Sequence, residues 1–219
     1  MTDYKSIYDF ALANGCEATF NEPLKKHTSF KIGGNAALFV VPQTDDALSA
    51  ILKKCSDENI RTVIIGNGSN LLVGDKGISG LVLEIGKEAE EITVEGNRLR
   101  VSAGAMLSKA ANVAASNNLG GMEFAAGIPG SLGGAVVMNA GAYGGEICRG
   151  CTRVEVMDLT GQIRIMSNEE MQFSYRHSLL EDTGDIVIRA DFCLTKGDPE
   201  QIKALISSIF ECECECAID

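Results

Sequence analysis

The sequence predicts an α+β fold with mixed sheets in two lobes, and three observations predict it. Short apolar strands alternate with amphipathic helices in the first third of the chain, and two hairpin patterns follow further on. The composition, with 45% hydrophobic residues and only four prolines, is that of a globular chain rather than a disordered one. At 219 residues the chain can bury a core as one large domain or two small ones.

The first third of the chain is expected to form a small α/β unit. Apolar residues at helical spacing predict a helix over 3–13, and Thr44 is the expected N-cap of a second helix. The apolar segments 36–42 and 61–66 flank this second helix and predict two strands, the later one buried. The strand–helix–strand order indicates that the two strands form a parallel pair.

The second part of the chain is expected to be richer in hairpins. Alternating apolar residues around Gly96-Asn97 and around Thr160-Gly161 predict two of them. The expected elements, in chain order, are strands at 81–85, 91–96 and 98–104, a helix at about 106–118, a hairpin over 153–167, a strand at 185–194 and a helix over 198–210 capped by Asp198.

Charge and hydropathy exclude several classes of partner. The formal net charge of -11 disfavours binding to nucleic acid or to an anionic membrane, because both require a positive patch. We see neither a signal peptide nor an apolar run of about 20 residues, the length that a membrane span needs. The sequence therefore predicts a cytoplasmic protein without membrane insertion.

The cysteines leave two questions open. Cys148 and Cys151 form a C-x-x-C pair, but no second Cys or His pair lies nearby, so a structural role is favoured over a zinc site. The sequence ends in ECECECAID, residues 211–219. In extended form its three cysteines would share one face and suit a soft metal, whereas the alternative is a frayed tail without a fold. No metal site is predicted.

A glycine-rich turn follows the strand at 61–66. In the stretch Gly66-Asn67-Gly68-Ser69-Asn70, small residues allow successive backbone N–H groups to point at one spot, an arrangement that binds phosphate oxygens. The stretch is not a P-loop, because no Gly-Lys-Ser/Thr follows. A plain glycine-rich turn is an equally good interpretation of this pattern alone.

A second glycine-rich stretch spans 124–147. Unlike a flexible linker, it interleaves apolar residues such as Ile128, Leu132 and Val136, which predicts an ordered and packed segment. Two ordered glycine-rich loops in one acidic chain suit a long ligand with a central diphosphate. The sequence therefore predicts a dinucleotide site.

The segment FSYRHSLL, residues 173–180, carries a candidate catalytic cation. Arg176 lies among apolar residues on a stretch with no obvious regular element. It either pairs with a surface carboxylate or presents a permanent positive charge to a substrate carboxylate or oxyanion. His177 is expected to be a solvent-facing neighbour.

Four stretches together resemble the UDP-N-acetylenolpyruvoylglucosamine reductase family, in order and at compatible spacing. They are HTSFKIGGNA (27–36), IIGNGSNLLVGDKGISGLVLEI (64–85), EFAAGIPGSLGGAVVMNAGAYGGEI (123–147) and FSYRHSLL. The resemblance implies a two-subdomain FAD-binding fold of the vanillyl-alcohol-oxidase (PCMH) type. It implies an N-terminal helix at 1–20, FAD-binding subdomains at 21–100 and 101–210, and an atypical tail at 211–219.

The resemblance also implies the cofactor site. Gly66, Asn67, Gly68, Ser69 and Asn70 then resemble the diphosphate-binding turn. The entry segment would supply Thr28, Ile32 and Gly33. The wall along FAD would comprise Gly127, Ile128, Gly130, Ser131, Gly133, Gly134, Ala135, Asn139, Gly141 and Ala142, with Val187 as a weaker candidate.

The implied chemistry is a hydride relay from NADPH through FAD to a UDP-linked enolpyruvyl amino sugar, which yields UDP-N-acetylmuramate for peptidoglycan. Arg176 matches the catalytic arginine of the family and would stabilise negative charge on the substrate carboxylate. Tyr175 is expected to orient substrate or cofactor.

The sequence departs from the family pattern after the helix at 198–210. Family members continue into a third, substrate-binding domain that carries a serine proton donor and an assisting glutamate, and its motif does not occur here. Two hypotheses therefore remain open: a reductase, or a truncated, catalytically impaired FAD-binding fragment.

Overall fold

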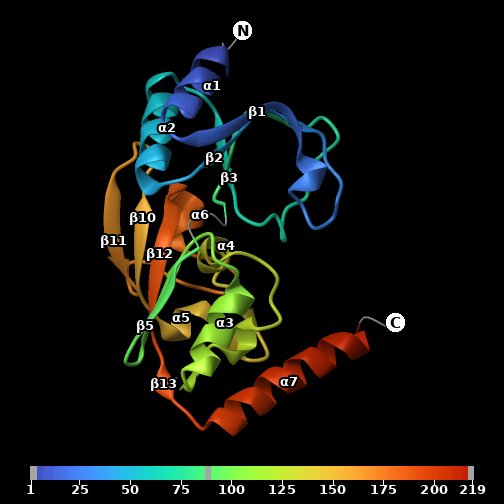
Figure 1. Ribbon diagram of the computed structural model, residues 1–219, viewed down its shortest axis with the longest axis vertical. Helices are drawn as coiled ribbons and strands as arrows, with labels where there is room; N and C mark the ends of the chain where they lie inside the picture. Colours follow the sequence, from blue (N-terminus) through green and yellow to red (C-terminus); the bar gives the residue numbers. More distant parts are fainter. Residues whose placement is uncertain (1–3, 87–89, 217–219) are drawn as a thin grey trace. The chain divides into compact units, whose positions relative to one another are not determined.

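The computed structural model describes residues 4–86 and 90–216, which fall into two compact units (Figure 1). Unit 1 comprises Met1–Ala89, Met157–Arg164 and Gly184–Ile186; unit 2 comprises Glu90–Val156, Ile165–Thr183 and Val187–Asp219. The first boundary lies before residue 90 rather than at the expected 100, because the strands after it pair with a strand far along the chain. The N-terminal helix also belongs to unit 1.

Unit 1 is built on a four-stranded sheet of order β1-β2-β4-β3. The β1/β2 pair is antiparallel, and β2/β4 and β3/β4 are parallel. Its elements are α1 (Tyr4–Ala13), β1 (Cys16–Pro23), the 3-10 helix η1 (Leu24–Lys26), β2 (Asn35–Pro42), α2 (Asp45–Asp57), β3 (Thr62–Ile65) and β4 (Ile78–Glu84).

Helix α2 forms where the sequence predicts it. The Thr44 hydroxyl oxygen accepts a hydrogen bond from the Ala47 N–H at 3.1 Å, which satisfies one of the free amides of the first turn. The apolar stripe is buried as expected: Ala47, Leu48, Ile51, Leu52 and Cys55. Helix α1 packs on β1, β2 and α2 through the fully buried Ile7 and Ala11.

The predicted parallel pair of β2 and β3 is corrected by the structure. Both strands run parallel, but β4 lies between them and pairs with each. Strand β3 is also less buried than expected, because only Ile65 at its end is buried. The apolar residues of β3 predict a strand that pairs within a sheet, but they do not predict that this strand lies at the edge of the sheet.

One face of this sheet anchors the loops that follow its strands. Leu24 of η1 and Val73 of the loop after β3 pack against Phe39, Ile65 and Val82 in one buried cluster. The loop is therefore ordered by its own apolar side chains, and the glycine-rich turn at its start is held against the sheet.

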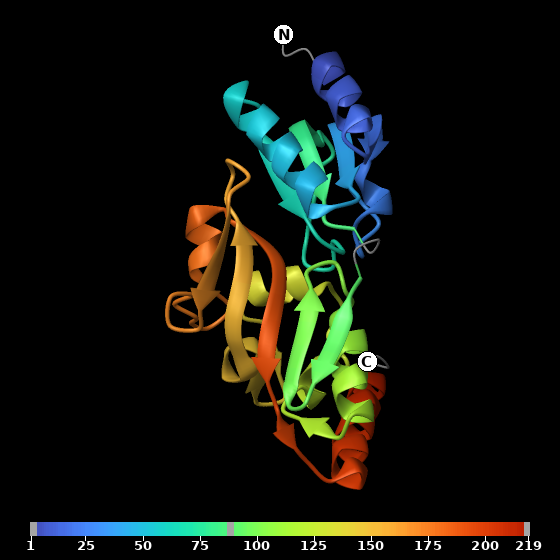
Figure 2. The ribbon, with the colours of Figure 1, turned by 60° about the vertical axis from the view of Figure 1, so that its left-hand side comes forward.

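The second sheet, most of whose residues belong to unit 2, has five strands in the order β11-β10-β12-β6-β5, with β5 and β12 antiparallel to β6. Figure 2 shows these strands side by side in front of α3 and α4. The elements of this part of the chain are β5 (Ile92–Glu95), β6 (Arg98–Ser102), α3 (Leu107–Ser116), β7 (Leu119–Gly120), η3 (Glu123–Ala125), α4 (Leu132–Val137), β8 (Gly141–Ala142), β9 (Gly145–Glu146), α5 (Ile147–Gly150), β10 (Cys151–Met157), β11 (Ile163–Ser167), α6 (Leu179–Thr183), β12 (Ile186–Cys193), β13 (Thr195–Lys196) and α7 (Pro199–Cys216). Both predicted hairpins are present.

A buried carboxylate joins three strands of this sheet. Asp191 of β12 is 3% exposed and accepts hydrogen bonds from Arg98 of β6 at 2.7 Å and from Arg153 of β10. Burial alone would raise the pKa of Asp191, but the hydrogen bonds from these two guanidinium groups outweigh it and hold the pKa below its usual value. The hydrogen bonds from Arg98 and Arg153 thus keep the buried Asp191 carboxylate ionised.

Helix α7 is longer than predicted. Asp198 accepts a hydrogen bond from the Glu200 N–H at 3.0 Å, so the expected cap is present. The helix continues past residue 210 to Cys216, because no glycine or proline stops it, and the extended and unfolded interpretations of residues 211–216 are both wrong. Residues 217–219, and the side chains on which a metal site would depend, lie outside the described residues. No helix in the described part of the chain is long and apolar enough to cross a membrane.

Candidate functional site

The glycine-rich turn after β3 is held by backbone contacts that only glycine permits. Gly68 is buried and has a φ of +62°. A Cβ at this position would lie 1.8 Å from the carbonyl oxygen of His27. The Gly68 carbonyl in turn accepts a hydrogen bond from the Ser29 N–H at 3.1 Å. The turn and segment 27–29 therefore pack backbone to backbone.

This turn leaves amide donors available. Within the residues that the structure describes, no protein oxygen accepts a hydrogen bond from the N–H of Asn67 or Gly68. Backbone amides are normally paired, and a residue with positive φ in such a turn makes neighbouring N–H groups converge. Ser69 and Asn70 follow at the rim, half-buried and exposed. The turn fits the diphosphate of a dinucleotide.

The predicted entry segment folds into a tight turn in the same unit. The buried Thr28 donates its hydroxyl to the Ile32 carbonyl at 3.1 Å, and the Ile32 side chain is 52% exposed. A Cβ on Gly33 would lie 2.8 Å from the Cβ of Val73 in the glycine-rich loop. The structure thus brings Thr28, Ile32 and Gly33 together with the turn after β3.

His27 is a residue at this site that the sequence patterns missed. Its ring nitrogens lie 3.2 Å from Glu22 of β1 and 3.1 Å from Glu84 of β4, and its ring packs on Phe39 at 4.1 Å between centroids. Burial raises the pKa of Glu22, but hydrogen bonds from His27 and Lys26 lower it below its usual value. Glu84 is distant in sequence, so no local motif could have revealed this bridge.

In unit 2, the second glycine-rich stretch packs against the segment after β6. The Leu132 and Gly133 amides donate to the carbonyls of Ala105 and Ala103 at 2.8 and 2.9 Å. A Cβ on Gly133 would lie 3.0 Å from the Ala103 Cβ, so close packing within the protein explains this glycine. Gly134 differs, because it is exposed and a Cβ there would meet only Ser131 Oγ at 3.7 Å.

The other residues predicted for this wall surround α4. Gly127, Ile128 and Gly130 precede the helix, Ala135 is buried within it, and Gly141 and Ala142 form β8. Gly145 of β9 lies against the Phe124 ring, where a Cβ would come to 2.4 Å of a ring carbon. Asn139 and Val187 are buried, with exposures of 2% and 3%. Their side chains face the protein interior.

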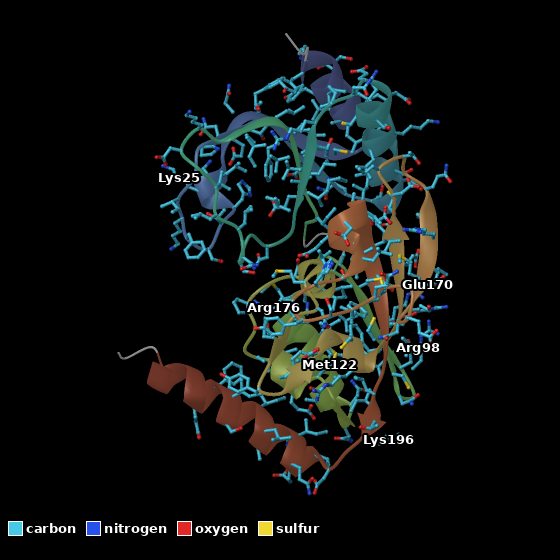
Figure 3. All side chains as sticks on the ribbon, turned by 180° about the vertical axis from the view of Figure 1, so that it is seen from behind. Lys25, Arg98, Met122, Glu170, Arg176 and Lys196 are labelled. Atoms are coloured by element: carbon cyan, nitrogen blue, oxygen red, sulfur yellow. The ribbon has the colours of Figure 1, made fainter. Side chains whose placement is uncertain are left out.

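Arg176 lies in a two-residue turn. The Ser174 and His177 amides each donate to the other residue's carbonyl, at 3.0 and 3.3 Å. Arg176 adopts a φ of +55°, which is uncommon for a residue other than glycine, and its side chain is exposed (Figure 3). Tyr175 beside it is 88% exposed. Among the described residues, no carboxylate forms an ion pair with Arg176.

The neighbouring histidine and the cysteine pair have partners of their own. His177 lies 3.1 Å from Glu181 and 3.4 Å from Asp182 on α6. Burial raises the pKa of the Cys151 thiol to about 12 and also raises that of Cys148, so neither is an activated thiolate. Within the part of the chain that the structure describes, no cluster of His, Cys, Asp or Glu could hold a metal.

Comparison with known proteins shows what the chain is similar to. A family described as FAD binding domain matches residues 36–167. The chain is 50% identical over 183 residues to UDP-N-acetylenolpyruvoylglucosamine reductase of Caldanaerobacter subterraneus subsp. tengcongensis. The aligned region covers 84% of this chain and 60% of that protein. The chain is 44% identical over 202 residues to the corresponding reductase of Lactococcus lactis subsp. cremoris, which covers 92% of this chain and 65% of that protein. The chain thus spans 60% and 65% of these two relatives' lengths.

Solved structures show the same relationship. The UDP-N-acetylenolpyruvylglucosamine reductase of Thermus caldophilus superposes with a TM-score of 0.75 at 32% identity, covering 90% of this chain and 68% of that chain. A glucooligosaccharide oxidase of Acremonium strictum, 18% identical with a TM-score of 0.64, covers 90% of this chain and 43% of its own and shares the fold. The predicted two-subdomain FAD-binding fold is confirmed. By sequence and by fold, the chain belongs to the UDP-N-acetylenolpyruvoylglucosamine reductase family.

Proposed function

We propose that this chain binds FAD and reduces the enolpyruvyl group of UDP-N-acetylglucosamine enolpyruvate with NADPH, giving UDP-N-acetylmuramate for peptidoglycan. Family membership supports the reaction class, and the relatives named above carry this activity in their names. With these cosubstrates, the proposal implies a cytoplasmic location. The observation that carries the proposal is Arg176, which is exposed on its turn and has no ion-pair partner among the described residues.

The turn after β3 supports FAD as the cofactor. The available amides of Asn67 and Gly68 would donate to the diphosphate, and no cationic side chain is needed in this acidic chain. FAD, when bound, supplies the carrier that accepts hydride from NADPH and passes it to the substrate. Thr28, Ile32 and Gly33 would border it, since they lie against the same loop.

The remaining proposed cofactor contacts come from unit 2 and from the rim of the turn. Backbone groups would make them where the side chain is buried, as for Asn139 and Val187. They are Gly66, Ser69, Asn70, Gly127, Ile128, Gly130, Ser131, Gly133, Gly134, Ala135, Asn139, Gly141, Ala142 and Val187.

Arg176 would stabilise the charge that develops during reduction of the substrate. Addition of hydride to an enol ether conjugated with a carboxylate places negative charge on that carboxylate. A guanidinium remains protonated and can bind a carboxylate through two parallel N–H bonds. Because no protein carboxylate competes for it among the described residues, Arg176 is available for this role. Tyr175 would orient the substrate beside it.

The proposal is tested with the purified chain in two steps. Titration with FAD, followed by quenching of flavin fluorescence, measures cofactor binding. Anaerobic addition of NADPH and then of the enolpyruvyl substrate tests turnover, because productive transfer bleaches the flavin absorbance and then restores it. FAD binding without restoration by substrate would show that the chain supplies a cofactor site without turnover. Absence of FAD binding would overturn the proposal.

Replacement of Arg176 gives the sharpest prediction. Arg176→Ala should slow the substrate-dependent step by about 10²–10³-fold, the loss seen when one oxyanion donor is removed. Reduction by NADPH should keep its rate, because that step involves no substrate carboxylate. Arg149→Ala, which removes another exposed arginine of unit 2, is the matched control. Equal effects of the two substitutions would exclude a specific role for Arg176.

A further inference from the structure

The turn that carries Arg176 is tied to the end of α4 at both of its ends. The Asn139 side-chain amide donates to the Ser174 carbonyl at 2.9 Å, just before the turn. The Ser178 hydroxyl donates to the Val137 carbonyl at 2.6 Å, just after it. Asn139 is 2% exposed and Ser178 is fully buried. Both bonds are therefore part-buried, and each has its donor on a buried residue.

Asn139 joins three segments at one point. Its Nδ2 also lies 3.3 Å from the Glu146 carboxylate of β9, and its Oδ1 accepts from the Cys148 N–H of α5 at 3.0 Å. Its φ of +43° lies in the left-handed region, which asparagine tolerates better than most residues. An asparagine supplies both the donors and the acceptor that this position uses.

The turn has few means of holding Arg176 by itself. It consists of two cross-turn hydrogen bonds, and its arginine adopts a positive φ that unfavourable sterics oppose. A short isolated hairpin is marginally stable in water, and non-glycine residues keep such conformations only where their surroundings fix them. Arg176 and Tyr175 are exposed, so they contribute little packing. The fixing contacts must come from the ends of the turn.

We propose that Asn139 and Ser178 are positioning residues that hold the turn, and with it Arg176, at a fixed place relative to the glycine-rich stretch of unit 2. The inference rests on the proposed role of Arg176 and assigns Asn139 a task other than contact with FAD through its side chain. A displacement of about 1 Å at a reacting group can cost about 10²-fold in rate. Loss of either tie should therefore act on the substrate-dependent step.

The test compares Asn139→Ala, Asn139→Asp and Ser178→Ala with a matched control. Asn168→Ala removes a side-chain amide that donates to the Cys148 and Cys151 carbonyls at 2.8 Å each, but it leaves the turn alone. Asn139→Asp keeps the acceptor for the Cys148 N–H and loses the amide donor to Ser174 and to Glu146. Amide hydrogen exchange of the intact chain, resolved by mass spectrometry, reads the His177 amide, whose partner is the Ser174 carbonyl.

In the three test variants, the His177 amide hydrogen should exchange about tenfold faster than in the unsubstituted chain. This factor corresponds to the loss of one hydrogen bond. Asn168→Ala should leave this amide unchanged. In Ser178→Ala, FAD affinity and the rate of reduction by NADPH should stay within about twofold, whereas the substrate-dependent step falls by about 10²-fold.

The outcomes separate this inference from the proposed function. Unchanged exchange at His177 in the variants that fold would overturn the positioning role, as would equal effects of Asn168→Ala on exchange. A wild-type chain without substrate turnover would count against the proposed function, while the exchange measurement would still decide the positioning role. If Asn139→Ala does not fold, Ser178→Ala and Asn139→Asp report on the two ties.

Discussion

Gly68 shows how the absence of one side chain fixes a loop. Its backbone passes so close to the His27 carbonyl that any Cβ would overlap it, and its φ is positive. The contact brings the amide-rich turn against the entry segment. A single methyl group at this position would therefore act on both segments, and on the amides that we propose for the diphosphate.

Gly68→Ala is expected to abolish FAD binding and to destabilise unit 1. The left-handed φ costs about 1–2 kcal/mol for alanine, and overpacking against a backbone carbonyl adds about 1–3 kcal/mol. Gly96→Ala is the matched control, because Gly96 has a φ of +65° with nothing within 4 Å of the added Cβ. Urea unfolding and FAD titration measure both variants. Equal losses in the two would show that the His27 contact is unimportant.

Asp191 predicts a pH dependence of stability. Its pKa in the folded protein is lowered, so its contribution to stability is present above its unfolded value, about 3.9, and is lost as the pH falls through the folded value. Asp191→Asn should cost about 2–3 kcal/mol near neutral pH, below the usual range for a broken buried pair because both arginines are partly exposed. Urea unfolding between neutral and acid pH should show the two proteins converging in acid. A constant difference would contradict the assignment.

At the scale of the elements, the sequence predicted features that depend on residues a few positions apart. It did not predict strand pairings between residues far apart in the chain. The cap and apolar stripe of α2 depend on neighbours three or four residues apart, so the sequence alone located them. The insertion of β4 between β2 and β3, and of β12 between β10 and β6, depends on contacts that no local period encodes. These insertions set which strands carry the site.

In the candidate site too, the sequence predicted local features and did not predict contacts between residues far apart in the chain. The turn after β3 could be predicted because glycines mark a local backbone geometry. The bridge from His27 to Glu84 and the tie from Asn139 to Ser174 join residues 57 and 35 positions apart, so their roles emerged only from the folded chain. Asn139 was predicted to line the cofactor, but its motif could not indicate where its amide donates.

At the scale of the whole molecule, unit 1 is assembled from three separate segments. The hairpin between β10 and β11 reaches α2, where Ser49 donates its hydroxyl to the Gly161 carbonyl at 2.8 Å. Arg164 and Asp185, from the second and third segments, form an ion pair in the same unit. Residues 157–164 and 184–186 thus complete unit 1, which otherwise consists of the first 89 residues of the chain.

Gly161→Ala should therefore destabilise α2 and not only the hairpin. Gly161 has a φ of +85°, and an added Cβ would lie 2.6 Å from Ser49 Oγ. Hydrogen exchange in α2 should quicken by about tenfold or more, since a contact worth roughly 1–3 kcal/mol is disturbed. Gly15→Ala, with a φ of +76° and nothing within 4 Å, serves as control within unit 1. Unchanged exchange in α2 would refute this coupling.

The three-segment construction of unit 1 bears on how the chain folds as it is synthesised. Domains generally fold as units, the N-terminal one first, as they leave the ribosome. Here the first unit lacks its last contribution, Gly184–Ile186, until most of the second has been translated. Folding of the nascent chain therefore cannot proceed one unit at a time, because the last segment of the first unit is made only after residues 90–183.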